Sequence, residues 1–309
     1  MESHTFEVGP DEGPVRLDQY LASVLPGPVS RSHIKKLIDS GNILVNGSPA
    51  KPHHKVKPGE RIEVRHEEPI PSRPEAEDIA LDILYEDDDI IVINKQAGIA
   101  VHPGAGKSSG TVVNALLNHC RELSDVDAAR PGIVHRLDKE TSGVMVAAKN
   151  NASHAELARQ FKDRTVKKYY LALVKGTVEL DNGTVDLPIG RHQSNRQKMA
   201  VRHDSERKAV TEYKVIKRFD GFTLVKLNLK TGRTHQIRVH MAYIGHPVLG
   251  DEKYGSRALK GGLSRQALHS YYLKLRHPTS GKEMEFTAGL PDDMKNMLGP
   301  DRNNFFLAF

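Results

Sequence analysis

Apolar residues recur at helical spacing in two short segments near the start of the chain. Pro26 and Pro28 follow the first segment and would end its helix. Its apolar positions would share one helical face: Leu17, Leu21, Val24 and Leu25. A second helix is predicted from Ser30 to Ser40, with Ser30 as its N-terminal cap. Strand patterns follow at 43–45 and 56–64, so residues 14–66 are expected to form a small α/β module.

Residues 67–78 separate this module from the rest of the chain. They contain Pro69, Pro71 and Pro74 among acidic residues, a composition typical of an extended linker. A second domain is therefore predicted over residues 79–309.

Strand patterns dominate the second domain and come mainly in hairpins. Short apolar or alternating runs predict strands at residues 81–85, 90–93, 144–148, 166–176 and 222–229. Helical spacing predicts helices at residues 112–117, 152–164 and 234–243, the last of them capped by Thr234. Because hairpins pair their strands antiparallel, we expect an α+β fold with a largely antiparallel mixed sheet and flanking helices.

Composition restricts the class of protein. Lys and Arg total 45 against 39 acidic residues, and the net charge of +6 suits a polyanionic partner as well as ordinary solubility. The single cysteine, Cys120, excludes a disulfide framework and any cysteine-based zinc site. Residues 1–9 contain no apolar core, and no apolar run approaches membrane-spanning length. We therefore expect a cytoplasmic protein that does not associate with membranes.

A polar loop between two apolar runs, residues 131–148, contains the strongest candidate for chemistry. Asp138 lies two residues after Arg136 and directly before Lys139. Nearby positive charge keeps a carboxylate ionised, and an ionised carboxylate can act as a nucleophile, a general base or a metal ligand. The alternative is a structural ion pair of Asp138 and Arg136 around a turn.

Three segments of the second domain resemble motifs of the RluA-type pseudouridine synthases, which isomerise uridine in ribosomal or transfer RNA. The first is the sequence His-Arg-Leu-Asp-Lys-Glu-Thr-Ser-Gly at 135–143, and the resemblance implies that Asp138 is the catalytic nucleophile. The second, 166–176, implies that Tyr170 stacks on the target base or handles its proton. The third, 229–255, implies that Arg238 pairs with the catalytic aspartate.

The same resemblance implies contacts with RNA. Arg136 would fill the gap left when the uridine leaves its stem, since enzymes of this kind extrude their target base. Arg233 and His235 are expected to face the RNA. His235 and His240 lie five residues apart on the predicted helix, a spacing that turns them away from a shared metal ion. The basic stretch 191–207 is predicted to be a surface loop or hairpin facing phosphates.

The N-terminal module resembles the S4 RNA-binding domain, named after the fourth protein of the small ribosomal subunit. In that family the second helix and the loop after it follow phosphates. The resemblance therefore assigns backbone contacts to Arg31, Lys35 and Lys36.

The resemblance implies an isomerase without a cofactor or a metal, because pseudouridine contains the same atoms as uridine. Large-subunit ribosomal RNA or a ribosomal precursor particle is the expected partner of a monomeric protein. Whether Asp138 attacks the ribose C1′ or removes the C2′ proton stays open. Three alternatives also stay open: a synthase acting on transfer RNA, a ribosome-associated RNA-binding protein without catalysis, and an aspartate-based glycosidase. The glycosidase would need a second acid, for which Glu140 is the only near candidate.

Overall fold

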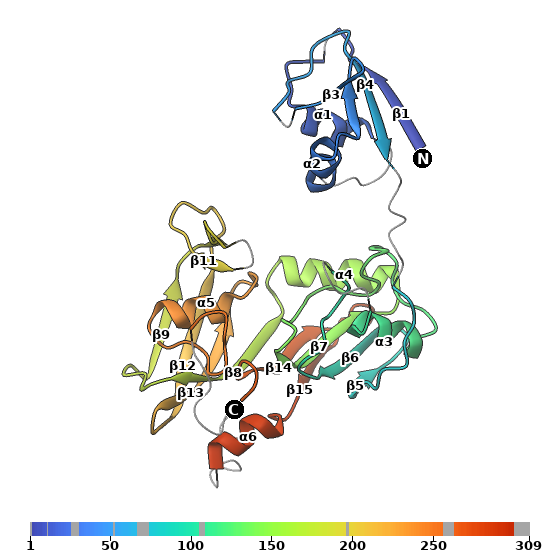
Figure 1. Cartoon of the computed structure of the whole chain (residues 1–309). Coiled ribbons are helices and arrows are strands. Elements are labelled where there is room, and N and C mark those ends of the chain that lie inside the picture. Colours follow the sequence, from blue (N-terminus) through green and yellow to red (C-terminus); the bar gives the residue numbers. More distant parts are fainter. Residues whose placement is uncertain are drawn as a thin grey trace. The chain divides into compact units, whose positions relative to one another are not determined.

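The computed structural model describes residues 2–10, 12–25, 31–51, 53–66, 74–104, 109–195, 198–255 and 263–299. The chain divides into two compact units, residues 1–72 and 73–309 (Figure 1). Among the described residues, no helix combines the length and the apolar character needed to cross a membrane.

The first unit is a four-stranded antiparallel sheet with two helices. The sheet has the order β1-β4-β2-β3. Asn46 and Gly47 have φ angles of 50° and 78° in the turn between β2 and β3, as a tight hairpin requires. The elements are β1 (Glu2–Glu7), α1 (Leu17–Val24), α2 (Arg31–Asp39), β2 (Ile43–Val45), β3 (Ser48–Pro49) and β4 (Arg61–His66).

Both helices were predicted from their apolar spacing, and Leu17, Leu21 and Ile34 are fully buried in the core of this unit. The predicted start of the module at residue 14 left out β1, which pairs with β4 along its whole length. The sequence of β1 is too short and too polar for a strand to be predicted from alternating apolar residues alone. The predicted cap Ser30 lies outside the described residues.

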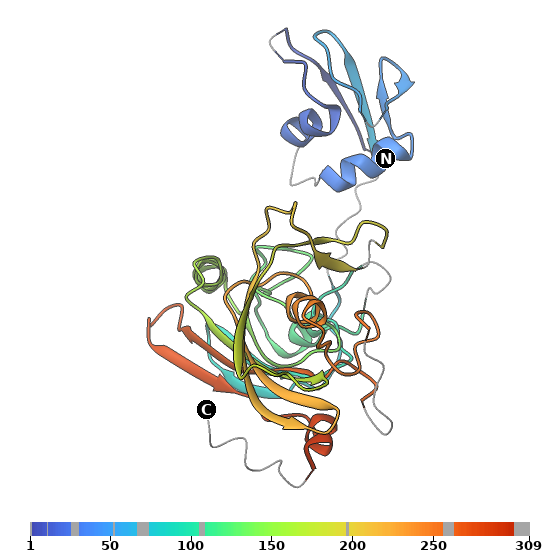
Figure 2. The same cartoon turned by 90° about the vertical axis from the view of Figure 1, so that its left-hand side faces the viewer.

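The second unit is built on one large sheet with the order β5-β6-β7-β14-β8-β13-β12-β9, and β15 pairs with β14. The sheet is strongly twisted, so the strands near its two edges run in different directions (Figures 1 and 2). Its strands are β5 (Ile83–Glu86), β6 (Ile90–Lys95), β7 (Ser142–Ala148), β8 (Lys167–Lys175), β9 (Asn182–Asp186), β12 (Val210–Phe219), β13 (Phe222–Leu229), β14 (Leu268–Arg276) and β15 (Glu283–Thr287).

The pair β7 and β14 is parallel, and the other described pairs of this sheet are antiparallel. The strands approach closely at Gly143, which has a φ angle of 114°. A Cβ atom there would lie 2.1 Å from the carbonyl oxygen of Ser270, so only glycine fits. The α+β prediction of a largely antiparallel mixed sheet with flanking helices is confirmed.

Two apolar clusters cover opposite faces of β6 and β7, because successive side chains of a strand alternate between faces. Ile91 and Ile93 pack with α3 in one cluster, and Ile90 and Val92 pack with Leu157 of α4 in the other. Helices α5 and α6 also bury residues in the first cluster. The helices are α3 (Val112–His119), α4 (Asn151–Lys162), α5 (Gln236–Tyr243) and α6 (Asp292–Leu298).

Two local predictions concern the segments around β10 and α5. The basic stretch 191–207 overlaps a hairpin, in which β10 (Ile189–Arg191) pairs with β11 (Met199–Val201). The prediction that Thr234 caps the helix after it is wrong. Helix α5 begins at Gln236 after His235, which has a left-handed φ of 56° and makes no side-chain cap.

The Pro-rich segment 67–78 was predicted to be a linker, and its last residues are attached to the second unit. Pro74 is buried. The Glu77 carboxylate accepts hydrogen bonds of 2.9 and 3.1 Å from the backbone N–H of Gly110. Asn114 reaches the same stretch through a bond of 2.7 Å to the Glu75 carbonyl. The ordered unit therefore begins before the predicted boundary at 79, and residues 67–73 lie outside the described residues.

Candidate active site

A groove with a volume of about 1270 Å³ lies on the second unit. Its walls come from the loop 133–138 before β7, the α4–β8 junction at 161–170 and the β13–α5 turn at 228–238. Asp138, Tyr170 and Arg238 all line it, although 100 residues separate the first from the last. The structure thus brings together the three side chains that the sequence motifs selected.

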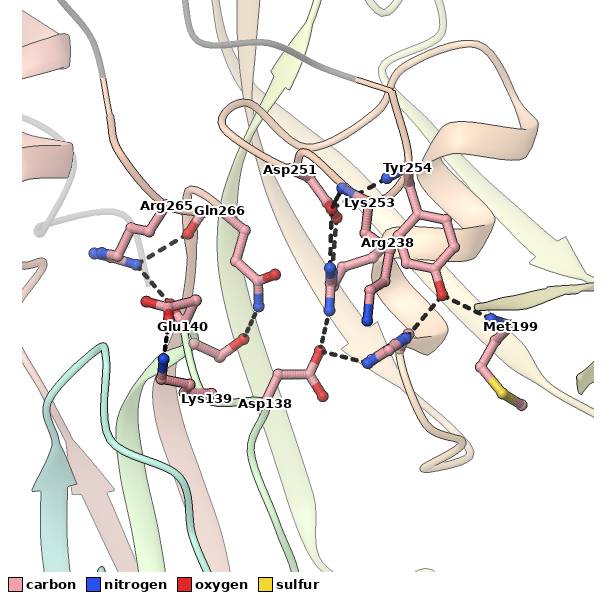
Figure 3. A network of polar contacts seen from close by, with 12 residues as sticks. Asp138, Lys139, Glu140, Met199, Arg238, Asp251, Lys253, Tyr254, Arg265 and Gln266 are labelled. Carbon is pink, nitrogen blue, oxygen red and sulfur yellow. Dashed lines mark hydrogen bonds and ion pairs between the residues drawn. The ribbon is translucent and has the colours of Figure 1, made fainter. Parts of the chain in front are cut away.

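Asp138 and Arg238 form an ion pair in the groove (Figure 3). The guanidinium Nη1 donates a hydrogen bond of 2.8 Å to Asp138 Oδ2. The same guanidinium donates through Nε and Nη2 to the two oxygens of Asp251, at 2.6 and 2.9 Å. Asp251 is completely buried and lies behind Arg238, so it fixes the direction in which Arg238 points.

This arrangement keeps Arg238 charged. Burial alone would lower the pKa of the guanidinium, but the hydrogen bonds and negative charge of Asp251, together with Asp138, raise the pKa above its usual value. The site therefore holds a permanent cation 2.8 Å from the Asp138 carboxylate.

His235 lies closer to the Asp138 carboxylate than the sequence suggested. Its Nε2 is 3.9 Å from Asp138 Oδ2, and its Nδ1 is 2.7 Å from the hydroxyl of Tyr254. The Tyr254 oxygen accepts a hydrogen bond of 2.9 Å from the N–H of Met199, so its own proton is available to His235 Nδ1 (Figure 3). Burial lowers the pKa of His235, which leaves the ring neutral at pH 7 with its Nε2–H toward Asp138.

A buried lysine holds the backbone of the Asp138 loop. Lys95, at the end of β6, is only 2% exposed. Its ammonium donates to the carbonyl oxygens of Gln96, Ile99 and Lys139, at 2.7, 2.9 and 3.0 Å. Burial lowers the pKa of Lys95 to about 7, while three carbonyl acceptors favour the charged form, which supplies three donors.

Further contacts fix the residues just after Asp138. The Thr141 N–H donates to the Asp138 carbonyl at 3.0 Å. Gln266 donates to the Thr141 hydroxyl at 2.7 Å, and Arg265 donates to the Glu140 carbonyl at 3.1 Å (Figure 3). The loop is therefore supported by residues that precede β14 as well as by Lys95.

Tyr170 is buried beside this loop and only 7% exposed. Burial raises the pKa of its phenol to about 12, so the phenol is protonated at neutral pH. The neighbouring Tyr169 also lines the groove, and its ring lies 6.3 and 5.3 Å from the rings of Tyr271 and Tyr272. Tyr170 is the more deeply buried of the two tyrosines.

The groove is strongly cationic. Asp138 is the only carboxylate among its described lining residues. Nine Lys and Arg residues line it with Asp138: Arg130, Arg136, Lys162, Arg164, Lys167, Lys168, Lys230, Arg233 and Arg238. Such a surface suits a polyanion. The glycosidase alternative is disfavoured, because Glu140 does not line the groove and its carboxylate lies 3.4 Å from the ammonium of Lys139.

The residues predicted to contact RNA are found on both units. Arg136 and Arg233 are exposed and line the groove. Lys35 is exposed on α2 of the first unit. The side chains of Arg31 and Lys36 lie outside the described residues.

One cluster of possible metal ligands lies away from the groove. Asp87, Asp89 and His277 offer ligand atoms within 4.8 Å of one another. Asp87 accepts from the Tyr85 hydroxyl at 2.6 Å and lies 2.9 Å from His277 Nε2. Asp89 accepts from Ser153 at 2.9 Å. These bonds connect the turn between β5 and β6 with α4 and the end of β14, which is a structural role.

A model of the RNA pseudouridylate synthase family matches residues 89–243, and a model of the S4 domain matches residues 15–62. The uncharacterized RNA pseudouridine synthase YlyB of Bacillus subtilis is 45% identical, over 94% of this chain and 95% of its own length. Ribosomal large subunit pseudouridine synthase D of Haemophilus influenzae is 45% identical, over 94% of this chain and 93% of its own length.

A solved structure agrees with these relatives. Human RNA pseudouridylate synthase domain containing 1 aligns with a TM-score of 0.57 and 29% identity, covering 68% of this chain and 83% of that protein. The chain belongs to the RNA pseudouridylate synthase family and carries an S4 domain. It is an isomerase that converts uridine to pseudouridine in RNA.

Three residues that complete the site were not identified from the sequence. Asp251 and Tyr254 lie within the third motif, and their positions there were the only available signal. Lys95 lies in a segment, 94–98, that also resembles the family, but no role was assigned to it because a lysine at the end of a strand is usually exposed.

Proposed function

We propose that this enzyme modifies large-subunit ribosomal RNA and that Asp138 is its reacting carboxylate. The observation that carries the proposal is a single carboxylate, held at 2.8 Å by Arg238, in a groove whose described lining includes nine Lys and Arg residues and no second carboxylate. A relative at 45% identity over nearly the same length is named as a ribosomal large subunit synthase.

The geometry of Asp138 suits either first step, attack on the ribose C1′ or removal of the C2′ proton. Arg238 and His235 both approach Oδ2, which leaves Oδ1 for the sugar. Arg238 lies beside the carboxylate before either step and stabilises its negative charge. Asp251 acts only through Arg238 and is a positioning residue.

Tyr170 would hold the detached uracil. With a pKa near 12, its phenol is a poor base at neutral pH, which favours packing against the base over removal of its proton. Holding the uracil beside the sugar keeps the two fragments together until the new C–C bond forms.

RNA would be held by both units. Arg136 would replace the extruded uridine in its stem, and Arg233 would bind near the mouth of the groove. Arg31, Lys35 and Lys36 would contact phosphates through the S4 domain, which raises the effective concentration of the synthase domain on its RNA. We further propose that a monomer acts in the cytoplasm on ribosomal RNA or a ribosomal precursor particle.

The chemistry is tested by tritium release from RNA that carries [5-³H]uridine. Forming the C–C bond replaces the hydrogen at C5, so the wild-type protein should release tritium. Asp138→Asn should release none while still binding RNA. Asp220→Asn, at an exposed position between β12 and β13, is the control and should keep wild-type activity. Full activity of Asp138→Asn would overturn the proposed role.

The substrate is tested separately. Large-subunit ribosomal RNA and transfer RNA, both unmodified, are compared in the same assay, and pseudouridines are mapped in a strain that lacks the protein. Missing modifications in transfer RNA alone would contradict the ribosomal assignment. An inactive wild-type protein that still binds ribosomal RNA would support a role limited to RNA binding.

A further inference from the structure

Lys168 occupies a distinctive position in the wall of the groove. It lies on β8 two residues before Tyr170, so both side chains project to the same face of the strand. Two residues of a strand span about 6.6 Å, which places Lys168 within one nucleotide of the proposed base site. Both residues line the groove.

The ammonium of Lys168 lies over an aromatic ring. Its Nζ is 5.3 Å from the centre of the Phe161 ring, and the Phe161 ring stacks on His135 at 4.6 Å. His135 is fixed in turn, because its Nε2 accepts a hydrogen bond of 3.1 Å from the Val146 N–H. Lys168 is thus packed on a rigid support.

No described carboxylate compensates the charge of Lys168. Lys95, which is buried, is surrounded by carbonyl oxygens, whereas the described residues give the half-buried Lys168 only the Phe161 ring. Burial alone lowers the pKa of Lys168, with no opposing acidic neighbour. Placing a cation in such surroundings costs free energy that a bound anion would recover.

The turn opposite Lys168 leaves room for such an anion. A Cβ atom at Gly232 would lie 3.8 Å from Lys168 Nζ, so the glycine at this exposed position faces the ammonium directly. Any long side chain at 232 would occupy this space. Arg164, Lys167 and Arg233 line the groove around it and add positive charge.

We propose that Lys168 and the turn at Gly232 form a phosphate subsite, which binds an RNA backbone phosphate next to the uridine that reacts at Asp138. The assignment rests on the proposed function of the groove. It gives Lys168 a role in binding and positioning RNA, distinct from the reaction at Asp138.

The test compares Lys168→Met with Lys168→Arg and a matched control. Lys226→Met is the control, because the Lys226 ammonium also lies over an aromatic ring, 4.4 Å from the centre of Tyr169, on the neighbouring strand β13. Tyr169 lines the groove, but Lys226 itself does not. Thermal melting curves establish that each variant is folded.

RNA binding is measured at several salt concentrations, with each substitution also placed in the inactive Asp138→Asn background. Losing one phosphate contact should reduce the slope of log K against log salt by about 0.7 to 0.9. We expect that reduction and a roughly tenfold weaker affinity for Lys168→Met, a restored slope for Lys168→Arg, and a wild-type slope for Lys226→Met. In the active background KM should rise with kcat unchanged.

A second variant keeps Lys168 in place. Gly232→Asp puts a carboxylate beside the ammonium and should lower the salt slope as Lys168→Met does. A wild-type slope in both variants would overturn the subsite, as would a loss of kcat without any change in slope. Because binding is measured in inactive protein, these outcomes do not depend on whether Asp138 has its proposed role.

Discussion

Replacing Asp251 with Asn tests whether the buried partner of Arg238 controls the site. The Asp251 side chain is 0% exposed and the Arg238 side chain 8% exposed, so the pair is shielded from water. Removing one charge from a buried ion pair costs about 3–5 kcal/mol of unfolding free energy. Asp138 remains as a second partner for Arg238, so we expect about 3 kcal/mol, the lower end of that range.

Catalysis should also suffer, because Asp251 sets the direction of the guanidinium. A loss of 1.4 kcal/mol in transition-state stabilisation lowers the rate about tenfold, and we expect kcat for tritium release to fall by at least about that factor. Urea unfolding and tritium release measure the two effects.

The control for this substitution is Asp204→Asn. Asp204 pairs with Arg202, but its side chain is 65% exposed. An exposed pair contributes about 0–1 kcal/mol, so this variant should be nearly as stable and as active as the wild type. Equal effects of the two substitutions, or a cost below about 1 kcal/mol for Asp251→Asn, would refute the reasoning.

Three further predictions concern buried groups. Lys95→Met removes three charge-assisted hydrogen bonds and should cost about 3 kcal/mol in urea unfolding, with a lower kcat because the Asp138 loop loosens. The pKa of His269 in the folded protein is about 4, below its value in the unfolded chain, so between about pH 7 and about pH 5 the unfolded chain takes up a proton that the folded protein does not. The unfolding free energy should therefore fall by on the order of 2 kcal/mol over this range. His269→Gln should reduce that loss, as measured by urea unfolding at each pH. Gly143→Ala should abolish the soluble folded protein seen by circular dichroism, since its Cβ would lie 2.1 Å from Ser270 O, whereas Gly289→Ala, with nothing within 4 Å, should fold normally.

The sequence motifs selected residues that lie together in the groove, but they did not indicate which buried residues support them. Asp138, Tyr170 and Arg238 were each assigned from a local motif, and the structure places them in one groove. Asp251 and Lys95 were missed because their roles arise from burial, which depends on chain packing and not on local spacing.

Local propensity also failed where tertiary contacts decide the conformation. Thr234 has a side chain suited to capping a helix, but α5 begins at Gln236. The side-chain amide of Gln236 bonds to the Thr231 hydroxyl at 2.7 Å and to the Val210 carbonyl at 2.9 Å. These contacts with residues outside the helix determine that it begins at Gln236. The strand β1 was missed for a related reason, since only its pairing with β4 makes it regular.

Strand β14 is synthesised after both of the strands that it joins in the sheet. This strand, residues 268–276, lies between β7, which follows the Asp138 loop, and β8, which carries Tyr170. During synthesis β7 and β8 leave the ribosome long before β14, which lies between them in the sheet and pairs with both. A nascent chain therefore cannot complete the catalytic groove until its last part has been translated and inserted into the sheet.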